Sequence, residues 1–445
     1  MEKLVDSIYN VVWSPALIVI LVGAGLYFTI RTRCVQVRRV GLMARLLFGK
    51  QKEGTEKGFS SFQAFCVALS GRVGTGNIVG VATAIAIGGP GAVFWMWLIA
   101  FLGASTAFME STLAQIYKFD HHGGWRGGPA SYIEGGLHQR WLGILFAIFT
   151  IIGYGTLLAM VQSNSVASAF SNSFNINPAV TGVVVVVLLA LVVIGGVKRI
   201  ANVASIVTPF MALAYIVMAF VIIIANRQAV PGVFASIFKC AFGIGPAAAG
   251  MLGSAISMGV KRGLFSNEAG QGGGAIVSGS AAVKHPAQQG LVQAFSVYVD
   301  TLLVCTATAL MILCTGSNGL DFGENYVAYT QTAIDTVFSG FGGPFVSVAL
   351  AFFTFTTIMA YYFYSETSII YLCDKWHIAG GVKEKIIIWI YRIVIFTALI
   401  LGACTGSGLV WTIGDIGLGL TTWINIIVLL ILCPQALKAL KDYES

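Results

Sequence analysis

The chain has 445 residues, of which 57% are hydrophobic and only 10% are charged, whereas soluble globular domains carry about a quarter charged residues. A chain this apolar cannot hide its surface from water, so the composition excludes a soluble protein and indicates one whose solvent is lipid. The formal net charge of +8 does not indicate a nucleic-acid partner, because the basic residues lie in short loops between apolar runs. The sequence therefore predicts a multi-pass protein of the cell membrane.

Eleven apolar runs are long enough for transmembrane helices, each of which needs about 20 residues. In chain order they are 13–32, 61–88, 91–117, 141–170, 179–196, 201–225, 245–272, 289–316, 345–372, 385–404 and 407–433. The predicted fold class is therefore an all-α membrane protein with eleven transmembrane helices. The first run follows an acidic rather than a basic stretch, so we expect a retained helix and not a cleaved signal. Between the spans we expect short surface helices, one within 118–140 and an amphipathic one at 326–338.

The predicted loops differ strongly in positive charge. Twenty Lys and Arg residues fall in loops on one side of the predicted membrane, and three (Lys3, Arg227 and Lys239) fall on the other side. An excess of Lys and Arg in short loops marks the cytoplasmic side. This distribution predicts an amino terminus outside the cell and a carboxyl terminus in the cytoplasm.

Several charged residues fall inside or near the predicted spans. The basic ones are Arg72, Lys261 and Arg262, and the acidic ones are Glu110, Glu268, Asp300, Glu366 and Asp415. An unpaired charge at this depth is expensive, so we expect structural or gating ion pairs between the two groups. Proton binding is the alternative role for any of these acids.

Two of the predicted spans contain glycine-rich interruptions. In the second span, residues 70–77 read SGRVGTGN, and each glycine costs about 1 kcal/mol in a helix relative to alanine. In the seventh span, residues 253–263 read GSAISMGVKRG, and we place the break between Ile256 and Gly263. Close packing of small residues against a neighbouring helix is the alternative explanation for both runs.

The positions of these two breaks divide the chain into related halves. With the first helix set aside, a broken helix opens spans two to six (61–226) and another opens spans seven to eleven (227–433). Because five is odd, the second set is inserted upside down relative to the first, and paired interruptions of this kind indicate a transporter's binding site. The expected single domain, 1–445, then comprises an extra helix with its loop (1–60), these two repeats, and a tail (434–445).

Three segments resemble signatures of the alanine/glycine:cation symporter family, namely 71–82 (GRVGTGNIVGVA), 88–97 (GGPGAVFWMW) and 262–270 (RGLFSNEAG). The resemblance extends over nearly the whole chain. It implies a LeuT-type fold of ten core helices plus one extra, coupling to sodium or in some members to protons, and alanine or glycine as substrate. We therefore expect sodium-coupled symport of a small neutral amino acid into the cell by alternating access. A proton-coupled symporter, a channel and an intramembrane enzyme are the alternatives.

The expected substrate-binding residues surround the two predicted breaks. They are Gly74, Thr75, Gly76, Asn77, Gln162, Ile256, Ser257, Met258 and Phe265. Free backbone N–H groups at the first break should hold the substrate carboxylate, and free carbonyl groups at the second should face its ammonium group. Met258 and Phe265 are expected to limit the space for the substrate side chain. For Gln162, an interhelical hydrogen bond is the alternative role.

A sodium site is expected between the second and ninth spans. Hard cations prefer carbonyl and hydroxyl oxygens, and helical spacing places the hydroxyls of Thr356 and Thr357 beside the carbonyl of Phe353. The ninth helix of the LeuT-type fold faces the first broken helix, and the resemblance implies that the carbonyls of Ser70 and Val73 complete the Na+ shell. Hydrogen bonding of both threonines to their own helix is the alternative. We expect no catalytic residues.

Overall fold

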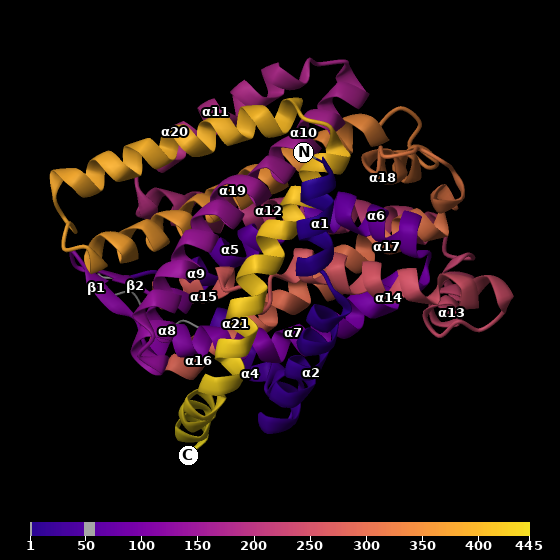
Figure 1. Ribbon diagram of the computed structural model, residues 1–445. Helices are drawn as coiled ribbons and strands as arrows, with labels where there is room; N and C mark the ends of the chain where they lie inside the picture. Colours follow the sequence, from indigo (N-terminus) through magenta and orange to yellow (C-terminus); the bar gives the residue numbers. More distant parts are fainter. Residues whose placement is uncertain (1, 49–57) are drawn as a thin grey trace.

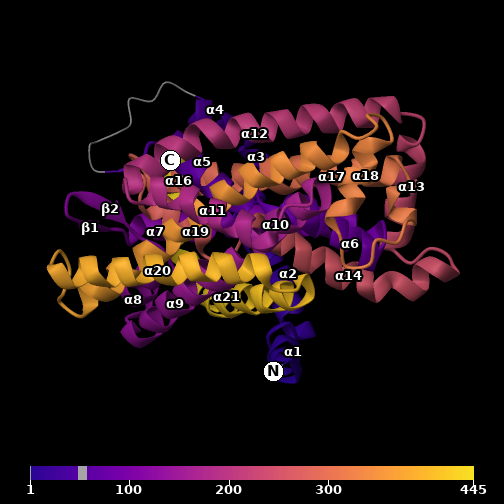
Figure 2. The same cartoon turned by 90° about the horizontal axis from the view of Figure 1, so that it is seen from above.

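The computed structural model describes residues 2–48 and 58–445. It is built almost entirely of helices, and most of the long ones lie roughly along one common axis (Figures 1 and 2). One end of this bundle carries the small hairpin of β1 and β2, and the other end carries α13 and α18. The predicted fold class is therefore confirmed as a helical bundle.

The first half of the bundle runs from the amino terminus to α12. Its elements are α1 (Glu2–Val12), α2 (Pro15–Arg31), α3 (Val35–Arg38), α4 (Val40–Phe48), α5 (Ser61–Arg72), the π-helix η1 (Gly76–Gly80), α6 (Val81–Gly88), α7 (Gly91–Ile116), β1 (Phe119–His121), β2 (Gly124–Arg126), α8 (Pro129–Leu137), α9 (Arg140–Ile152), the π-helix η2 (Gly153–Leu158), α10 (Ala159–Phe174), α11 (Pro178–Val193) and α12 (Val197–Ala225).

The second half runs from α13 to the carboxyl terminus. Its elements are α13 (Val230–Ala241), α14 (Pro246–Asn267), α15 (Gly273–Gly279), α16 (Pro286–Val297), the π-helix η3 (Tyr298–Cys305), α17 (Thr306–Cys314), the short 3-10 helix η4 (Ser317–Gly319), α18 (Val327–Asp335), α19 (Gly342–Lys375), α20 (Val382–Cys404) and α21 (Ser407–Glu444).

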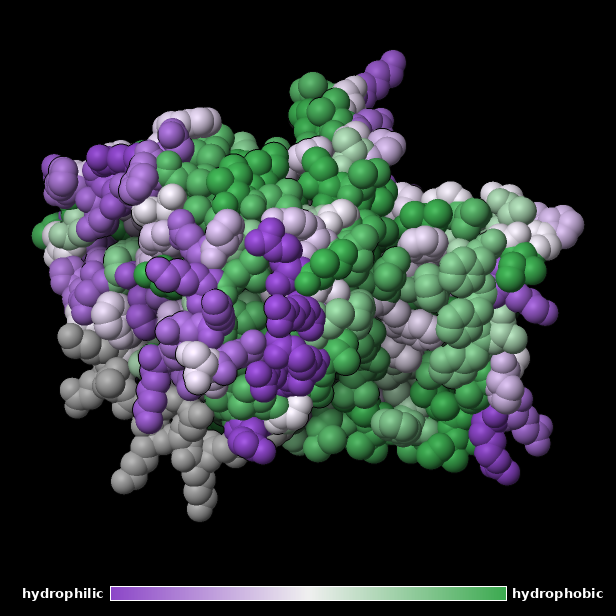
Figure 3. Space-filling view, turned by 90° about the horizontal axis from the view of Figure 1, so that it is seen from below, coloured by the Kyte–Doolittle hydropathy of each residue, from purple (hydrophilic) through white to green (hydrophobic). Residues whose placement is uncertain are grey.

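The outer surface of the bundle is apolar. Large side chains on α12 and α20 face outwards, among them Phe210, Leu213 and Ile393, each of which is more than 60% exposed. On the face shown in Figure 3, hydrophobic residues form a broad belt, and hydrophilic residues gather towards the two ends. In water such a belt would be strongly unfavourable, whereas in a bilayer it faces the lipid chains. The surface therefore agrees with a membrane protein.

Fewer helices than predicted satisfy the requirements of a membrane span. Eight helices of the described residues are long and apolar enough to cross a bilayer, and the bent pair of α5 with η1–α6 makes nine. The other two predicted spans are helical, but α11 has only 16 residues, and α14 carries Lys261, Arg262 and four glycines. The count of eleven and the orientation of the termini therefore stay predictions.

The break predicted in the second span is confirmed. The helix α5 ends at Arg72, and the segment Gly76–Gly88 continues at an angle of 51° to it. The glycines here make room for side chains of α19. A Cβ atom at Gly71 would lie 2.1 Å from the hydroxyl oxygen of Tyr364, and one at Gly74 would lie 2.5 Å from Oγ1 of Thr357.

The break predicted between Ile256 and Gly263 is wrong in position. The helix α14 is continuous through this segment and ends at Asn267. The helix is interrupted only at Glu268–Gly272, where φ is positive at Glu268, Gly270 and Gly272, and α15 follows. Two of the four glycines of α14 instead serve close packing, because a Cβ atom at Gly259 would lie 2.5 Å from the carbonyl oxygen of Ala92 in α7, and one at Gly263 would lie 3.2 Å from Cα of Met96. Small-residue helix packing, the alternative explanation, accounts for Gly259 and Gly263.

The two segments expected to carry short helices both do so, but 118–140 also contains strands. Antiparallel β1 and β2 are joined by His122 and Gly123, whose φ angles are 49° and 78°. Two consecutive positive φ angles are the geometry of a tight two-residue hairpin turn. The hairpin was not predicted, because a histidine in this conformation is not an obvious turn signal. The helices α8 and α18 lie within the expected segments.

Candidate substrate and cation site

The five oxygen donors predicted for sodium come together between α5 and α19. Oγ1 of Thr357 lies 2.8 Å from the carbonyl oxygen of Ser70, 3.3 Å from that of Val73 and 2.9 Å from that of Phe353. Oγ1 of Thr356 lies 3.0 Å from the same Phe353 oxygen. All five residues are buried. The donor set consists of carbonyl and hydroxyl oxygens, which hard cations prefer.

The hydroxyl group of Thr357 has too few hydrogens for its neighbours. It carries one hydrogen and two lone pairs, yet three carbonyl oxygens lie within 3.3 Å of it. At least two of these carbonyl oxygens therefore face the hydroxyl oxygen without a shared proton. A cation among the oxygens would convert this repulsion into attraction, so the donors fit a sodium ion. The hydrogen bonds of both threonines to their own helix are also present.

The helix break frees one of these carbonyl oxygens. In a continuous helix the oxygen of Ser70 would accept from the N–H group of Gly74, four residues later. That N–H group donates instead to Oδ1 of Asn77 at 2.9 Å. The interruption thus supplies an oxygen for a cation and rearranges the N–H groups beside it.

Side-chain amides occupy two of the N–H groups predicted to bind the substrate carboxylate. Gly74 donates to Asn77, and Thr75 donates to Oε1 of Gln162 at 3.0 Å. Gln162 comes from α10, so its alternative role, an interhelical hydrogen bond, is also observed. The hydroxyl group of Thr75 is buried and has no hydrogen-bond partner among the described residues. It is available to a ligand at this break.

Asn77 also connects the first break to Asp300 in η3. Its Nδ2 lies 2.7 Å from Oδ1 of Asp300. The other carboxylate oxygen of Asp300 accepts from the hydroxyl groups of Ser266, at 2.5 Å, and Thr301, at 2.6 Å. All four of these residues are buried. The two broken segments therefore share one hydrogen-bonded network through Asp300.

Phe265, which is predicted to limit the pocket, lies against the first break. Its ring approaches to 2.9 Å from the position of a Cβ atom at Gly76. On its other side the ring packs on Trp411 of α21, with ring centroids 5.0 Å apart. The Arg262 guanidinium lies 4.8 Å above the Trp411 ring and pairs with Asp415. Phe265 and Trp411 thus form an aromatic pair, and the Arg262–Asp415 ion pair lies against it.

Three of the predicted substrate residues do not lie at either helix break. Ile256, Ser257 and Met258 lie within the continuous helix α14. Ile256 is eleven positions before Asn267, which corresponds to about 16 Å along the helix axis. Their carbonyl groups are not freed by a break, because the break lies at Glu268–Gly272. Met258 instead approaches Gly88, at the far end of α6.

Buried charged groups stabilise the second break. Oε2 of Glu110, on α7, accepts from the N–H groups of Gly270 and Gly272 at 3.2 Å each, and from Nδ2 of Asn425 at 3.1 Å. The Arg72 guanidinium donates to the carbonyl oxygen of Asn267 at 2.7 Å. An acid and a base of the chain thus bind the N–H and carbonyl groups that this break exposes.

A cavity of about 390 Å³ lies beside the Phe265–Trp411 aromatic pair. Val79 of η1, Asn164 and Ser165 of α10, and Trp411 are among the residues that line it. Because Trp411 also packs on Phe265, the cavity borders the aromatic pair whose Phe265 ring lies against Gly76. The cavity is large enough for a small solute.

Comparison with known proteins shows the family of the chain. The model of the sodium:alanine symporter family matches residues 1–445. The chain belongs to the sodium:alanine symporter family. Its relatives are membrane transporters and not enzymes, so this member is a multi-pass transporter of the cell membrane.

Two curated relatives and one solved structure illustrate the similarity. A putative sodium/proton-dependent alanine carrier protein of Bacillus subtilis is 50% identical, over 100% of this chain and 93% of its own length. A probable sodium/glutamine symporter of the same organism is 41% identical, over 100% and 91%. The crystal structure of MhsT in complex with L-phenylalanine has a TM-score of 0.56 and 15% identity, over 86% of this chain and 100% of that one. This structural similarity shows the LeuT-type fold of the family.

Sequence reasoning missed one residue of the site in this family member, Trp411, and the partners of two others. Trp411 lies in an apolar run without any polar signal. Glu110 and Asp300 were identified as acids within spans, but their backbone and side-chain partners were not. Intramembrane acids are the one sequence signal that could have led to them.

Proposed function

We propose that this protein is a secondary active symporter that couples sodium entry to the uptake of alanine and glycine by alternating access. The observation that carries the proposal is the hydroxyl group of Thr357, which faces three carbonyl oxygens with one hydrogen. Sodium at this point would lie against the first helix break, so its binding would favour one arrangement of that break. The substrate contacts the same break, which gives the two solutes a shared element.

The substrate carboxylate is proposed to bind the N–H group of Thr75. To do so it replaces Oε1 of Gln162, and a charged acceptor forms a stronger hydrogen bond than a neutral amide. Phe265 closes the pocket on the side of Gly76, which favours a small substrate side chain. The relative named as an alanine carrier supports this choice, whereas the relative named as a glutamine symporter indicates that pocket size varies within the family.

Proton coupling is a second candidate, carried by Asp300. Its carboxylate is fully buried and accepts three short hydrogen bonds at the junction of the two broken segments. A proton on this group would change the network that joins them. The relative named sodium/proton-dependent agrees with such a role. A gradient of protons alone would then drive uptake.

Uptake of labelled alanine into proteoliposomes tests both candidates. Under the sodium proposal, an inward sodium gradient drives accumulation, and choline with or without a proton gradient does not. Thr357→Val should raise the sodium concentration for half-maximal uptake at least tenfold, because a lost bond to a charged group costs about 1.5–3 kcal/mol. Thr354→Val is the control, since Thr354 is equally buried on α19 but its hydroxyl group donates to the carbonyl oxygen of Ala351, at 3.5 Å, which is not one of the proposed sodium ligands.

The outcomes separate the possibilities. Equal sodium dependence in Thr357→Val and the control would place the cation elsewhere. Uptake that follows only the proton gradient, and that Asp300→Asn abolishes, would favour the second candidate.

A further inference from the structure

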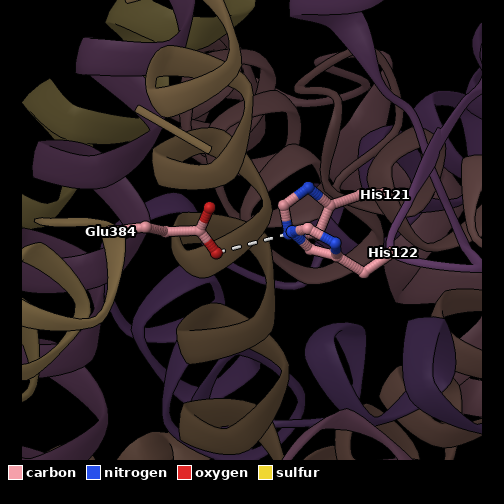
Figure 4. A group of neighbouring side chains, drawn as sticks. All are labelled: His121, His122 and Glu384. Carbon is pink, nitrogen blue, oxygen red and sulfur yellow. Dashed lines mark ion pairs between the residues drawn. The ribbon is translucent and has the colours of Figure 1, made fainter. Parts of the chain in front are cut away.

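Three potential metal ligands converge where the β1–β2 hairpin meets the start of α20, far from the helix breaks in sequence. His121 and His122 belong to the hairpin, and Glu384 belongs to the first turn of α20 (Figure 4). Nε2 of His121 lies 3.3 Å from Oε1 of Glu384. One ligand atom from each of the three residues lies within 4.8 Å of the others.

The conformation of the turn brings two adjacent imidazoles to the same side. Neighbouring side chains of a strand normally point to opposite faces. His122 departs from this rule because its backbone is left-handed, with φ of 49°. The two ring centroids are consequently 4.4 Å apart. The turn thus doubles the number of imidazoles that face Glu384.

The loop before α20 is shaped to receive them. A Cβ atom at Gly380 would lie 2.4 Å from both Cε1 and Nε2 of the His122 ring, so glycine at this position leaves room for the ring where it lies in the structure. The N–H group of Gly380 also donates to Oε2 of Glu384 at 2.6 Å. This bond orients the carboxylate and leaves Oε1 directed at His121. Gly380 therefore positions two of the three ligands.

We propose that His121, His122 and Glu384 form a binding site for a divalent transition metal of the zinc type. Two imidazoles and one carboxylate are a common zinc ligand set, with bonds of about 2.0–2.2 Å. Two ligand atoms on such a tetrahedral ion lie about 3.3 Å apart, which is the separation of His121 and Glu384. The exposed ring of His122 completes the set by a small side-chain rotation.

The surroundings suit this ligand set. The side chains of His121 and Glu384 are only 12% and 9% exposed. An ion between them would therefore be bound by ligands that are already largely shielded from water. Both histidines line a cavity of about 810 Å³, which gives water access to the remaining coordination position. The site is independent of the proposed sodium and alanine chemistry.

Zinc binding to the purified full-length protein tests this site directly. The protein should carry no polyhistidine tag and should be freed of metal with a chelator before titration with zinc chloride in a calorimeter. We expect one zinc ion per chain, and at least tenfold weaker binding for His122→Ala and for Glu384→Gln. His138→Ala is the control, because His138 is exposed at the end of α8 and lies outside the cluster. Zinc K-edge absorption should show two imidazole nitrogens and at least one oxygen.

Folding of the variants is checked without zinc by size exclusion and melting temperature. His122 is exposed and should not affect either, so this variant keeps the test decisive. Zinc should raise the melting temperature of the wild-type protein and of His138→Ala, but not of His122→Ala. Absence of binding to the wild-type protein, or equal binding by all variants, would overturn the proposal.

Discussion

Asn77 illustrates how one side chain can serve several partners at a helix break. Its Oδ1 accepts from the N–H group of Gly74, and its Nδ2 donates to the carboxylate of Asp300. It therefore shapes the proposed carboxylate site without contacting the cluster of oxygens around Thr357. This separation allows the two proposed sites to be distinguished by mutation.

We expect Asn77→Ala to weaken alanine binding about tenfold or more at every sodium concentration. The substitution leaves buried hydrogen-bonding groups unpaired, which costs about 1–3 kcal/mol, or one to two decades. Alanine affinity measured at low and at saturating sodium checks this. Thr357→Val should instead recover alanine affinity at saturating sodium, because its defect lies in the linked ion. Thr83→Val, a buried variant further along α6, is the control. Recovery of Asn77→Ala at high sodium would contradict the assignment.

At the scale of residues, the sequence predicted the proposed cation site better than the proposed substrate site. The hydroxyls of Thr356 and Thr357 were found because helical spacing alone places them beside the Phe353 carbonyl. Trp411 was not found, because its contact with Phe265 depends on how α21 packs against the end of α14. Sequence periodicity does not show how helices that are far apart in the sequence pack against each other.

At the scale of elements, glycine runs of similar composition have different structural roles. In the second span, the glycines admit the side chains of Tyr364 and Thr357, and the helix bends by 51°. In α14, Gly259 and Gly263 admit the backbone of α7, and the helix stays straight enough to be continuous. Both roles require the absence of a Cβ atom. The sequence therefore revealed close contact in both runs but located only one break.

We predict that Gly259→Ala lowers the melting temperature of the detergent-solubilised protein. The added Cβ atom would lie 2.5 Å from the carbonyl oxygen of Ala92, and overpacking of this kind costs about 1–3 kcal/mol. Gly253→Ala is the matched control on the same helix, since nothing lies within 4 Å of its Cβ position. The control should leave the melting temperature unchanged or raise it, because alanine favours a helix over glycine. Thermal unfolding followed by tryptophan fluorescence measures both. Equal melting temperatures in the two variants would show that α14 and α7 can separate without cost.

At the scale of the whole molecule, the apolar composition predicted a membrane protein, and both the surface and the family agree. The direction in which the chain enters the membrane rests on loop charge alone. The exact number of spans also stays a prediction, because α14 combines basic residues with glycines and α11 is short. Composition decides how much of a chain avoids water, but it does not decide how each short helix sits in lipid.

Native cysteines provide a test of orientation. Cys34 and Cys404 are exposed, and the predicted topology places Cys34 in the cytoplasm and Cys404 outside. In variants that retain only one of them, a membrane-impermeant maleimide should label Cys404 in intact cells and Cys34 only after the cells are opened. The buried Cys66, retained alone, is the control for background labelling. The reverse pattern would mean that the chain is inserted the other way round.

The contacts of Glu110 give the two helix breaks different chemical characters. The N–H groups of the second break are bound by this acid of the chain itself, whereas neutral amides bind those of the first break. Under the proposed symport, a zwitterionic substrate that enters between them would find the first break receptive to its carboxylate, which would set the direction in which it binds. With the carboxylate and ammonium directions fixed, mirror-image forms of alanine differ only in where the methyl group points. Selection between the two forms would then follow from the difference between the breaks, and through Glu110 from an acid that the proposal does not place in contact with the substrate.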